Sequence, residues 1–252
     1  MTMFTTFSEQ FRKQDICLFT ECIGDIAPFG FVSAATTGLG ATTFSNSNTD
    51  ASSASQPNGW VVVNMSATAN TVPAVYPRVG IYPAAGIPAG GAVNRDFRVG
   101  RGEIDLEVRV RGISPEGVGG GATSITTVGV GSTSDTSSTV ATSFVGFFAW
   151  ATDNSKWTAG IVVNSVLVRS VVTTIPSTQT WTVLRVVVNE KANRHKLYAD
   201  GKLIATFDGQ LDTTAGLLPH VEMADRTLAN TGGSAQRAFQ VDYMMLKMKA
   251  QR

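Results

Sequence analysis

Residues 181–207 constrain the fold more than any other part of the chain, because they contain three strand-like runs and two short turns. Asp200-Gly201 separates the last two runs, and its glycine can adopt the positive φ that a type I′ hairpin requires. We therefore expect a tight antiparallel hairpin here. In the first run, residues 181–188, both alternating faces are mostly apolar, which is typical of a strand covered on both sides in the middle of a sandwich.

Strand-like segments continue through much of the chain. Apolar or alternating runs bounded by turn residues predict strands at 60–65, 103–111, 125–130, 144–151, 157–163, 166–173, 221–224 and 238–248. By contrast, the prolines and glycines of residues 72–91 predict an irregular surface segment. So many short strands in a chain of 252 residues predict an all-β fold, a two-sheet antiparallel jelly-roll sandwich.

The chain is expected to comprise an N-terminal arm, residues 1–24, and a single jelly-roll domain, residues 25–252. Phe4, Phe7 and Phe11 follow helical spacing, so the arm could form a short amphipathic helix. This segment either packs on its own domain or docks on a neighbouring subunit, and the sequence leaves both alternatives open.

The charge balance argues against nucleic-acid and membrane partners. The formal net charge is +1, and the basic residues are scattered along the sequence. No apolar run is long enough to span a bilayer. The first residues lack the basic region, apolar region and cleavage site of a secretory signal, so we expect synthesis in the cytoplasm.

Few residues are suited to holding a metal ion, so no cofactor and no metal are expected. His195 and His220 are the only histidines and lie far apart in the sequence, which fits no standard zinc pattern. Cys17 and Cys22 are expected to be reduced thiols, with a local disulfide as the alternative. Two aspartates, at positions 200 and 208, could bind calcium, but turn residues are the simpler interpretation.

An acidic alternation at Glu103, Asp105 and Glu107 is the main candidate for catalysis. It resembles the Glu-x-Asp-x-Glu signature of the laminarinase, agarase and xyloglucanase family of retaining glycosidases. That resemblance implies a nucleophile at Glu103, a tuning carboxylate at Asp105 and an acid/base at Glu107. The alternative is an ordinary solvated strand face, because Arg109 and Arg111 continue the same alternation and balance its charge.

Tryptophans provide the candidate contacts to sugars. Trp150, Trp157 and Trp181 could form a platform on which sugar rings stack, and Trp150 and Trp157 are the candidates for glycan contact. The alternative places these rings in the hydrophobic core.

Seven features follow one another from residue 103 toward the C-terminus. They are the strand at 103–111, a Gly-rich strand at 127–131, Phe147-Phe-Ala-Trp150, the Trp157 strand, Trp-x-x-Leu-x-Val from Trp181, Leu-Tyr-x-Asp-Gly before position 202, and Val241-Asp-Tyr243. In this order of features the chain from residue 104 to the C-terminus resembles the concanavalin A-like and laminin-G-like jelly rolls of bacteriophage structural proteins.

This resemblance implies a non-enzymatic virion component, either a capsid decoration (cement) protein or a tail-fibre protein. Its partners would then be other virion proteins and further copies of this chain in a homo-oligomer, with a surface glycan as an additional ligand. A carbohydrate-active protein is the alternative, either a retaining glycosidase using Glu103 and Glu107 or a glycan-binding module.

Overall fold

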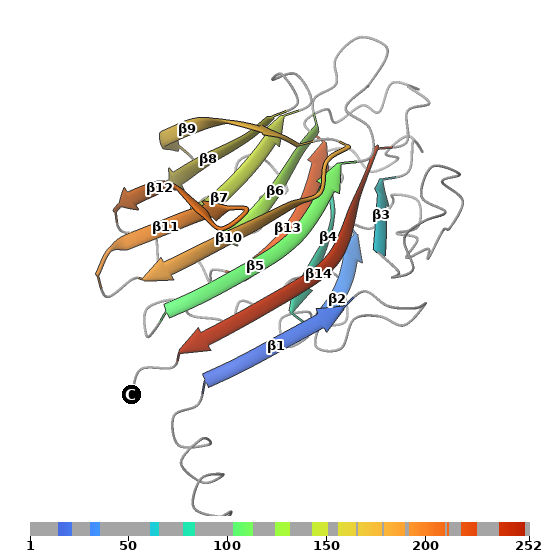
Figure 1. Ribbon diagram of the computed structural model, residues 1–252, viewed down its shortest axis with the longest axis horizontal. Coiled ribbons are helices and arrows are strands. Elements are labelled where there is room, and N and C mark those ends of the chain that lie inside the picture. Colours follow the sequence, from blue (N-terminus) through green and yellow to red (C-terminus); the bar gives the residue numbers. More distant parts are fainter. Residues whose placement is uncertain are drawn as a thin grey trace, which may run out of the picture.

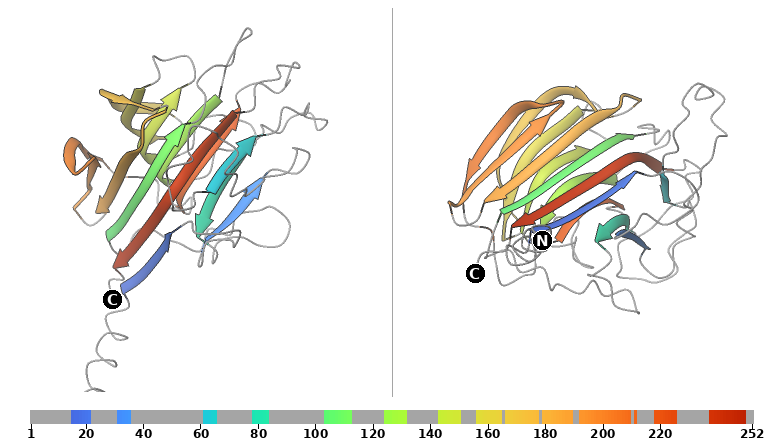
Figure 2. Two further views of the ribbon diagram at one scale, coloured as in Figure 1. Left: turned by 45° about the vertical axis from the view of Figure 1, so that its right-hand side comes forward. Right: turned by 60° about the horizontal axis from the view of Figure 1, so that its bottom comes forward.

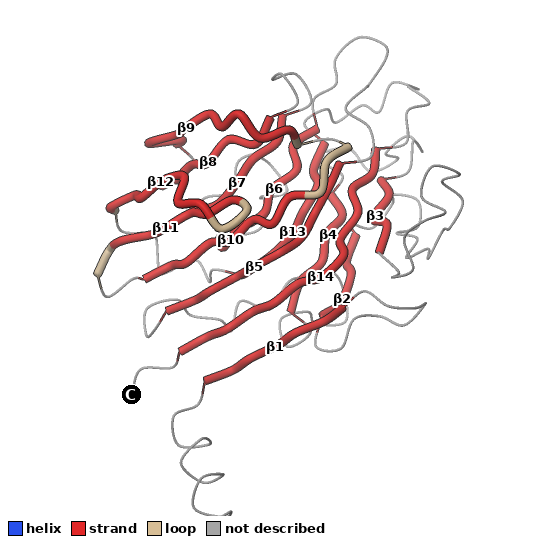
Figure 3. The backbone as a smooth tube through the Cα atoms, in the orientation of Figure 1, coloured by secondary structure: helices blue, strands red, loops and turns tan. Residues whose placement is uncertain are grey.

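The computed structural model describes fourteen strands and the short connections between some of them. The described residues are 15–21, 31–35, 61–65, 78–83, 103–112, 124–131, 143–150, 156–164, 166–177, 179–189, 192–209, 211, 218–225 and 237–249. Figure 3 shows that the described part of the chain is strand and loop, without a helix. None of these residues belongs to a helix that could cross a membrane.

The first sheet, sheet A, has seven strands (Figure 1). Six of them lie side by side, and the seventh pairs with the N-terminal half of β14. In spatial order they are β1 (Asp15–Glu21), β14 (Arg237–Lys249), β5 (Glu103–Gly112), β10 (Thr182–Asn189), β11 (Arg194–Ala199) and β12 (Lys202–Asp208), with β3 (Val61–Met65) beside β14.

The second sheet, sheet B, also has seven strands and stacks against the first (Figure 2). In spatial order they are β2 (Phe31–Ala35), β4 (Arg78–Pro83), β13 (Leu218–Asp225), β6 (Ser124–Gly131), β7 (Ser143–Trp150), β8 (Lys156–Val163) and β9 (Val166–Pro176). Every described strand pair is antiparallel. The predicted all-β, two-sheet jelly-roll sandwich is therefore confirmed.

The hairpin predicted at Asp200-Gly201 is present between β11 and β12. Both turn residues have positive φ, 47° for Asp200 and 75° for Gly201, as a type I′ turn requires. The Asp200 carboxylate also accepts a hydrogen bond of 2.9 Å from the backbone N–H of Val183, which ties the turn to β10. Asp200 therefore acts as a turn residue.

Alternation along the strands of sheet A builds one side of the core. Along β5, the even-numbered side chains from Ile104 to Val110 are at most 3% exposed, whereas the odd-numbered ones point away from the core and are partly exposed. β10 follows the same pattern, with Leu184 and Val186 fully buried. The prediction that β10 is covered on both faces was wrong, because its second face belongs to the partly exposed outer side of sheet A.

Strands β7 and β8 of sheet B are buried on both faces. Val145 and Phe147 of β7 pack into the core between the sheets, while Phe144 and Phe148 lie on the opposite face and are also buried. Glycines make this possible: an added Cβ at Gly146 would lie 2.6 Å from the Phe144 ring. The aromatic layer therefore lies directly on the backbone of β6 and β7.

Two segments differ from the sequence-based expectations. Residues 15–21, assigned to the N-terminal arm, form β1, which pairs along its whole length with β14 and so belongs to sheet A. The remainder of the arm, with its expected helix, lies outside the described residues. The interpretation of residues 72–91 as irregular was wrong for β4, where Ile81 is 1% exposed; Pro83 is tolerated because it ends the strand.

Candidate functional site

The three carboxylates singled out in the sequence lie together on the outer face of sheet A. Glu103, Asp105 and Glu107 alternate with the buried residues of β5 and therefore point away from the core. Register places Asn189, Val187 and Arg185 of β10 opposite them, in that order. The structure thus confirms the shared face, and it supplies each carboxylate with a neighbour on another strand.

Asp105 is held by Arg185. The guanidinium donates two hydrogen bonds of 2.7 Å, one to each carboxylate oxygen, which is the bidentate geometry preferred by this pair. The Arg185 side chain is 42% exposed and that of Asp105 is 13% exposed. The hydrogen bond to Asp105, which outweighs partial burial, raises the pKa of Arg185. Arg185 also lies 5.6 Å from the centre of the Tyr198 ring, within cation–π range.

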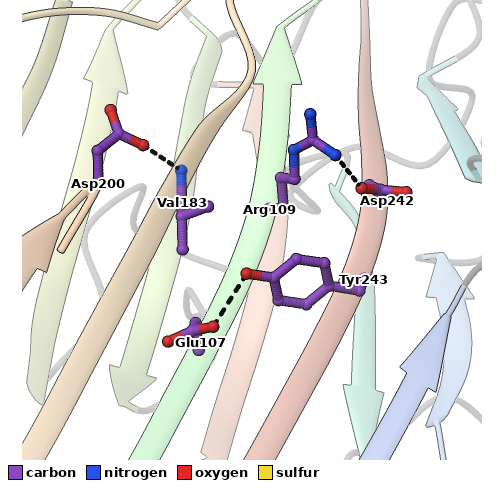
Figure 4. A network of polar contacts seen from close by, with 6 residues as sticks. All are labelled: Glu107, Arg109, Val183, Asp200, Asp242 and Tyr243. Atoms are coloured by element: carbon purple, nitrogen blue, oxygen red, sulfur yellow. Dashed lines mark hydrogen bonds and ion pairs between the residues drawn. The ribbon is translucent and has the colours of Figure 1, made fainter.

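Glu107 and Glu103 have partners on opposite sides of β5. The hydroxyl of Tyr243, from β14, donates a 2.9 Å hydrogen bond to Glu107, as Figure 4 shows. Burial, followed by this hydrogen bond to a carboxylate, raises the pKa of Tyr243 to about 12. Glu103 accepts a longer contact of 3.5 Å from the side-chain amide of Asn189 on β10.

A β-bulge in β14 places Asp242 and Tyr243 on the same face. The pairing with β5 shifts between Val241 and Tyr243, so Asp242 is the extra residue and does not turn inward. Its carboxylate accepts a 2.5 Å hydrogen bond from Arg109 on β5 (Figure 4). Without the bulge, alternation would send one of these two side chains into the core.

Trp181, the residue before β10, lies next to Arg109 and Arg111 of β5. The guanidinium carbons of Arg109 and Arg111 lie 5.2 Å and 4.9 Å from the centre of the indole ring. Arg111 is oriented by a hydrogen bond to the side-chain oxygen of Gln240. We call the resulting partly exposed surface the Trp–Arg face. It consists of Trp181, Arg109, Arg111, Arg185, Tyr198, Asp105, Glu107, Asp242 and Tyr243.

The tryptophans proposed as glycan contacts separate from one another in the structure. Trp157 is 1% exposed and packs in the core, so its assignment to a surface platform is wrong; the neighbouring residues of β8 are buried on both faces of the strand. Trp150 ends β7, and its side chain lies outside the described residues. Of the three tryptophans, Trp181 is the one whose side chain is both described and partly exposed.

Candidate metal ligands do not come together in the part of the chain that is described. His195 is buried and its Nε2 lies 2.9 Å from the backbone oxygen of Gly209. Asp208 pairs with Arg194 at 2.9 Å across an exposed surface. Cys22 lies outside the described residues, so the alternatives of reduced thiols and a disulfide with Cys17 stay predictions.

Sequence reasoning missed several residues of the Trp–Arg face. Tyr198 and Arg185 meet because β10 and β11 pair in a particular register, and Asp242 depends on the bulge. The signal available in the sequence was the Asp200-Gly201 turn, which fixes alternation in β11 and so points Tyr198 outward. No such local signal marks the bulge.

A second polar pair lies on the outer face of sheet B. His220 and Glu222 of β13 are 2% and 3% exposed and lie on either side of Val221, which faces the core. The His220 ring is 5.5 Å from that of Phe144. These two residues belong to the buried aromatic layer rather than to the Trp–Arg face.

Comparison with solved structures places the fold among concanavalin A-like jelly rolls. A protein of unknown function from Shewanella oneidensis MR-1 has 14% identity and a TM-score of 0.56, with coverage of 99% of this chain and 95% of that one. A β-1,3-1,4-glucanase (lichenase) from a mouse hindgut metagenome has 10% identity and a TM-score of 0.55, covering 91% and 98%. Peanut lectin has 12% identity and a TM-score of 0.54, covering 94% and 98%.

These likenesses establish the fold alone. No protein-family model and no curated protein matches the sequence. The concanavalin A-like part of the resemblance drawn from the sequence is thus confirmed, and nothing in the comparisons supports its viral part.

Proposed function

We propose that this protein is a glycan-binding module without catalytic activity, and that the Trp–Arg face is its binding surface. The observation that carries the proposal is the set of contacts around Trp181, a partly exposed residue whose indole lies beside two guanidinium groups, close to carboxylates that are held by hydrogen bonds.

Such a surface has the chemistry that a sugar requires. Aromatic side chains offer apolar surface to the C–H groups of a pyranose, while carboxylates and guanidinium groups exchange hydrogen bonds with its hydroxyls. Arg109, Arg185 and Tyr243 are each held by a hydrogen bond to a carboxylate on a neighbouring strand. Binding therefore needs little reordering of side chains, which lowers its entropic cost. The balance of acidic and basic groups favours a neutral glycan.

The same contacts argue against the glycosidase alternative. A retaining mechanism needs two carboxyl groups about 5–5.5 Å apart with free access to the sugar. Glu103 and Glu107 are four residues apart on one strand, with Cα atoms about 13 Å apart, so their side chains would have to lean toward each other to bring the carboxyl groups that close. Their side chains contact Asn189 and Tyr243, on opposite sides of β5. Asp105, between them, is engaged by Arg185.

A glycan microarray tests the proposal. We expect the purified chain to bind at least one neutral oligosaccharide class. Trp181→Ala should weaken that binding at least about tenfold, equivalent to about 1.4 kcal/mol. Thr180→Ala, at the exposed neighbouring position, is the matched control and should bind like the wild type. Circular dichroism must show that both variants are folded. Absence of binding to any glycan would overturn the proposal.

A structural role in a virion is the second candidate. The sequence resemblance implies it, and the apolar edge formed by β9 favours a role in assembly. Electron cryo-microscopy of particles from the native source is the test. Copies of the chain at symmetric positions on a capsid or tail would support this role, and a monomer that binds no particle would exclude it.

A further inference from the structure

β9 is an edge strand whose apolar side chains are exposed. It is the last strand of sheet B and pairs with β8 (Figure 1). Among the described residues, six large hydrophobic side chains are exposed, and five of them belong to β9. They are Val166 (62%), Leu167 (44%), Val168 (56%), Val171 (42%) and Val172 (63%).

The sixth side chain lies on the outer face of sheet A, opposite Tyr198 of β11. Leu203 of β12 is 55% exposed, and β12 is the last strand of its sheet. β9 and β12 contact each other, and the charge of Arg169 on β9 lowers the pKa of Asp208 on β12, after the larger effect of Arg194. The two sheets therefore end side by side, at an edge that we call the β9–β12 edge, and its apolar side chains are those of β9.

Two of the usual protections against strand pairing are missing from this edge. Exposed edge strands commonly carry several charges or an interior proline, whereas Arg169 is the single charge of β9, and Pro176 is its final residue. Register shifts interrupt the pairing with β8 on either side of residues 169–172, which keep a regular register. That segment presents an open, regular strand to solvent.

The pattern of exposure indicates what covers it. Val171 and Val172 point to opposite faces of the sheet, and both are exposed. A ligand lying on one face would leave the other uncovered, so the partner must be a strand that extends the sheet and places side chains on both faces. β9 carries Arg169, and β12 carries Lys202 and Asp208, so the edge has little net charge and a strongly charged partner is disfavoured.

β9 of a second copy meets these requirements. In an antiparallel pair centred on Ser170, Val168 faces Val172 of the second copy, and Arg169 faces a valine rather than another arginine. The strand has 11 residues, so it spans about 36 Å. Two sheets about 10 Å apart make an edge about 20 Å wide, which gives roughly 700 Å² per chain and approaches the roughly 800 Å² of a stable interface.

We propose that two copies of this chain associate through the β9–β12 edge, with β9 of each copy paired antiparallel to the other so that sheet B continues across the dimer. The pairing satisfies the outward backbone groups of β9 and removes its valines from water. This association is independent of glycan binding, because the Trp–Arg face is the outer surface of sheet A rather than its edge.

Sedimentation equilibrium of the full chain at about 1–100 µM tests the proposal. We expect the wild type to have twice the chain mass of 26.6 kDa. Val172→Lys should shift the protein to monomer, with self-association weakened at least about tenfold. Leu203→Lys should weaken it less, and Thr180→Lys, an equal change at an exposed site outside both edge strands, should leave the dimer intact.

Two results would overturn the inference: a wild-type monomer over the whole concentration range, or an oligomer that persists unchanged in Val172→Lys. Val172 is 63% exposed, so the variant is expected to fold, and far-ultraviolet circular dichroism checks this. Glycan binding measured on the same variant separates the two proposals, because a monomeric Val172→Lys protein should still bind sugar.

Discussion

At the residue scale, an ion pair of the Trp–Arg face differs in burial from an ion pair outside it. Arg185 and Asp105 form a bidentate pair in which the aspartate side chain is 13% exposed, whereas both members of the Arg194–Asp208 pair are about 60% exposed. Removing the first guanidinium leaves a partly buried carboxylate without its donors, and removing the second leaves a solvated one.

We therefore expect Arg185→Ala to lower the free energy of unfolding by about 1 kcal/mol, a value already reduced for solvent screening of the exposed arginine. Arg194→Ala should cause no measurable change. Urea denaturation of the two variants checks this. Equal effects from the two substitutions would contradict the assigned role of Asp105.

His195 makes stability depend on pH. Burial lowers its pKa, so the folded protein binds a proton less readily than the unfolded chain, whose histidines titrate near about 6.5. The free energy of unfolding should therefore be unaffected by this group above about pH 6.5 and should fall as the pH drops below that value.

Melting temperatures of the wild type and His195→Gln, measured from about pH 7.5 to 5, test this expectation. Glutamine can keep the contact with the Gly209 oxygen without titrating, so the variant should lose less stability on acidification. Other titrating groups are common to both proteins and cancel in the comparison. Parallel pH profiles would show that His195 is not responsible.

Some residue positions could be predicted from sequence and others could not. The shared face of Glu103, Asp105 and Glu107 follows from alternation with a period of two, which is local information. The sequence left both a surface platform and burial in the core open for Trp157, because a strand with apolar residues on both faces gives no sign of which face meets solvent. The outward position of Asp242 required knowledge of the bulge.

At the scale of elements, glycine marks the places where the backbone itself is part of the packing. Gly129 of β6, Gly146 of β7 and Gly160 of β8 lie opposite one another across three paired strands. Rings of Phe144 and Phe148 occupy the space that their Cβ atoms would take.

Gly146→Ala should therefore destabilise the protein by about 1–3 kcal/mol or more, because the new methyl group would overlap both the Phe144 ring and the Val128 carbonyl oxygen. Gly201→Ala is the matched control. Its Cβ would meet nothing within 4 Å, so its cost of about 1 kcal/mol comes from the positive φ alone. Chemical denaturation compares them, and a Gly146 variant no less stable than the Gly201 variant would contradict this packing.

The strands themselves were largely predictable wherever a turn signal bounded them. β5, β8 and the β11–β12 hairpin follow the sequence pattern closely. The sequence pattern did not predict β1 or β4, because β1 lacks a regular alternation and prolines near β4 favoured a loop. Their pairing is set by β14 and by β2 and β13, which are distant in sequence.

At the scale of the whole molecule, the fold is shared by proteins with different roles. The similar structures include a lectin and a glucanase. The fold therefore leaves the function to be decided by particular surfaces. The sequence pointed to one such surface through its acidic strand, and the structure added the aromatic and arginine residues around it.

Catalysis and binding predict different behaviour toward β-glucan. We expect the wild type to release no reducing sugar. We also expect Glu103→Gln to leave glycan binding within about threefold of the wild type, because Trp181 and the two arginines beside it are unchanged. A reducing-sugar assay beside a binding assay measures both. Turnover that disappeared in Glu103→Gln would establish the glycosidase alternative.

Nuclear magnetic resonance would show whether a sugar binds at the Trp–Arg face. Amide spectra of the isotopically labelled chain would be recorded during titration with an oligosaccharide selected on the microarray. We predict that the shifted amides belong to β5, β10, β11 and β14, with the indole N–H of Trp181 among the shifted signals. Shifts centred instead on β13 and β6, around His220 and Glu222, or no shifts at all, would contradict the account.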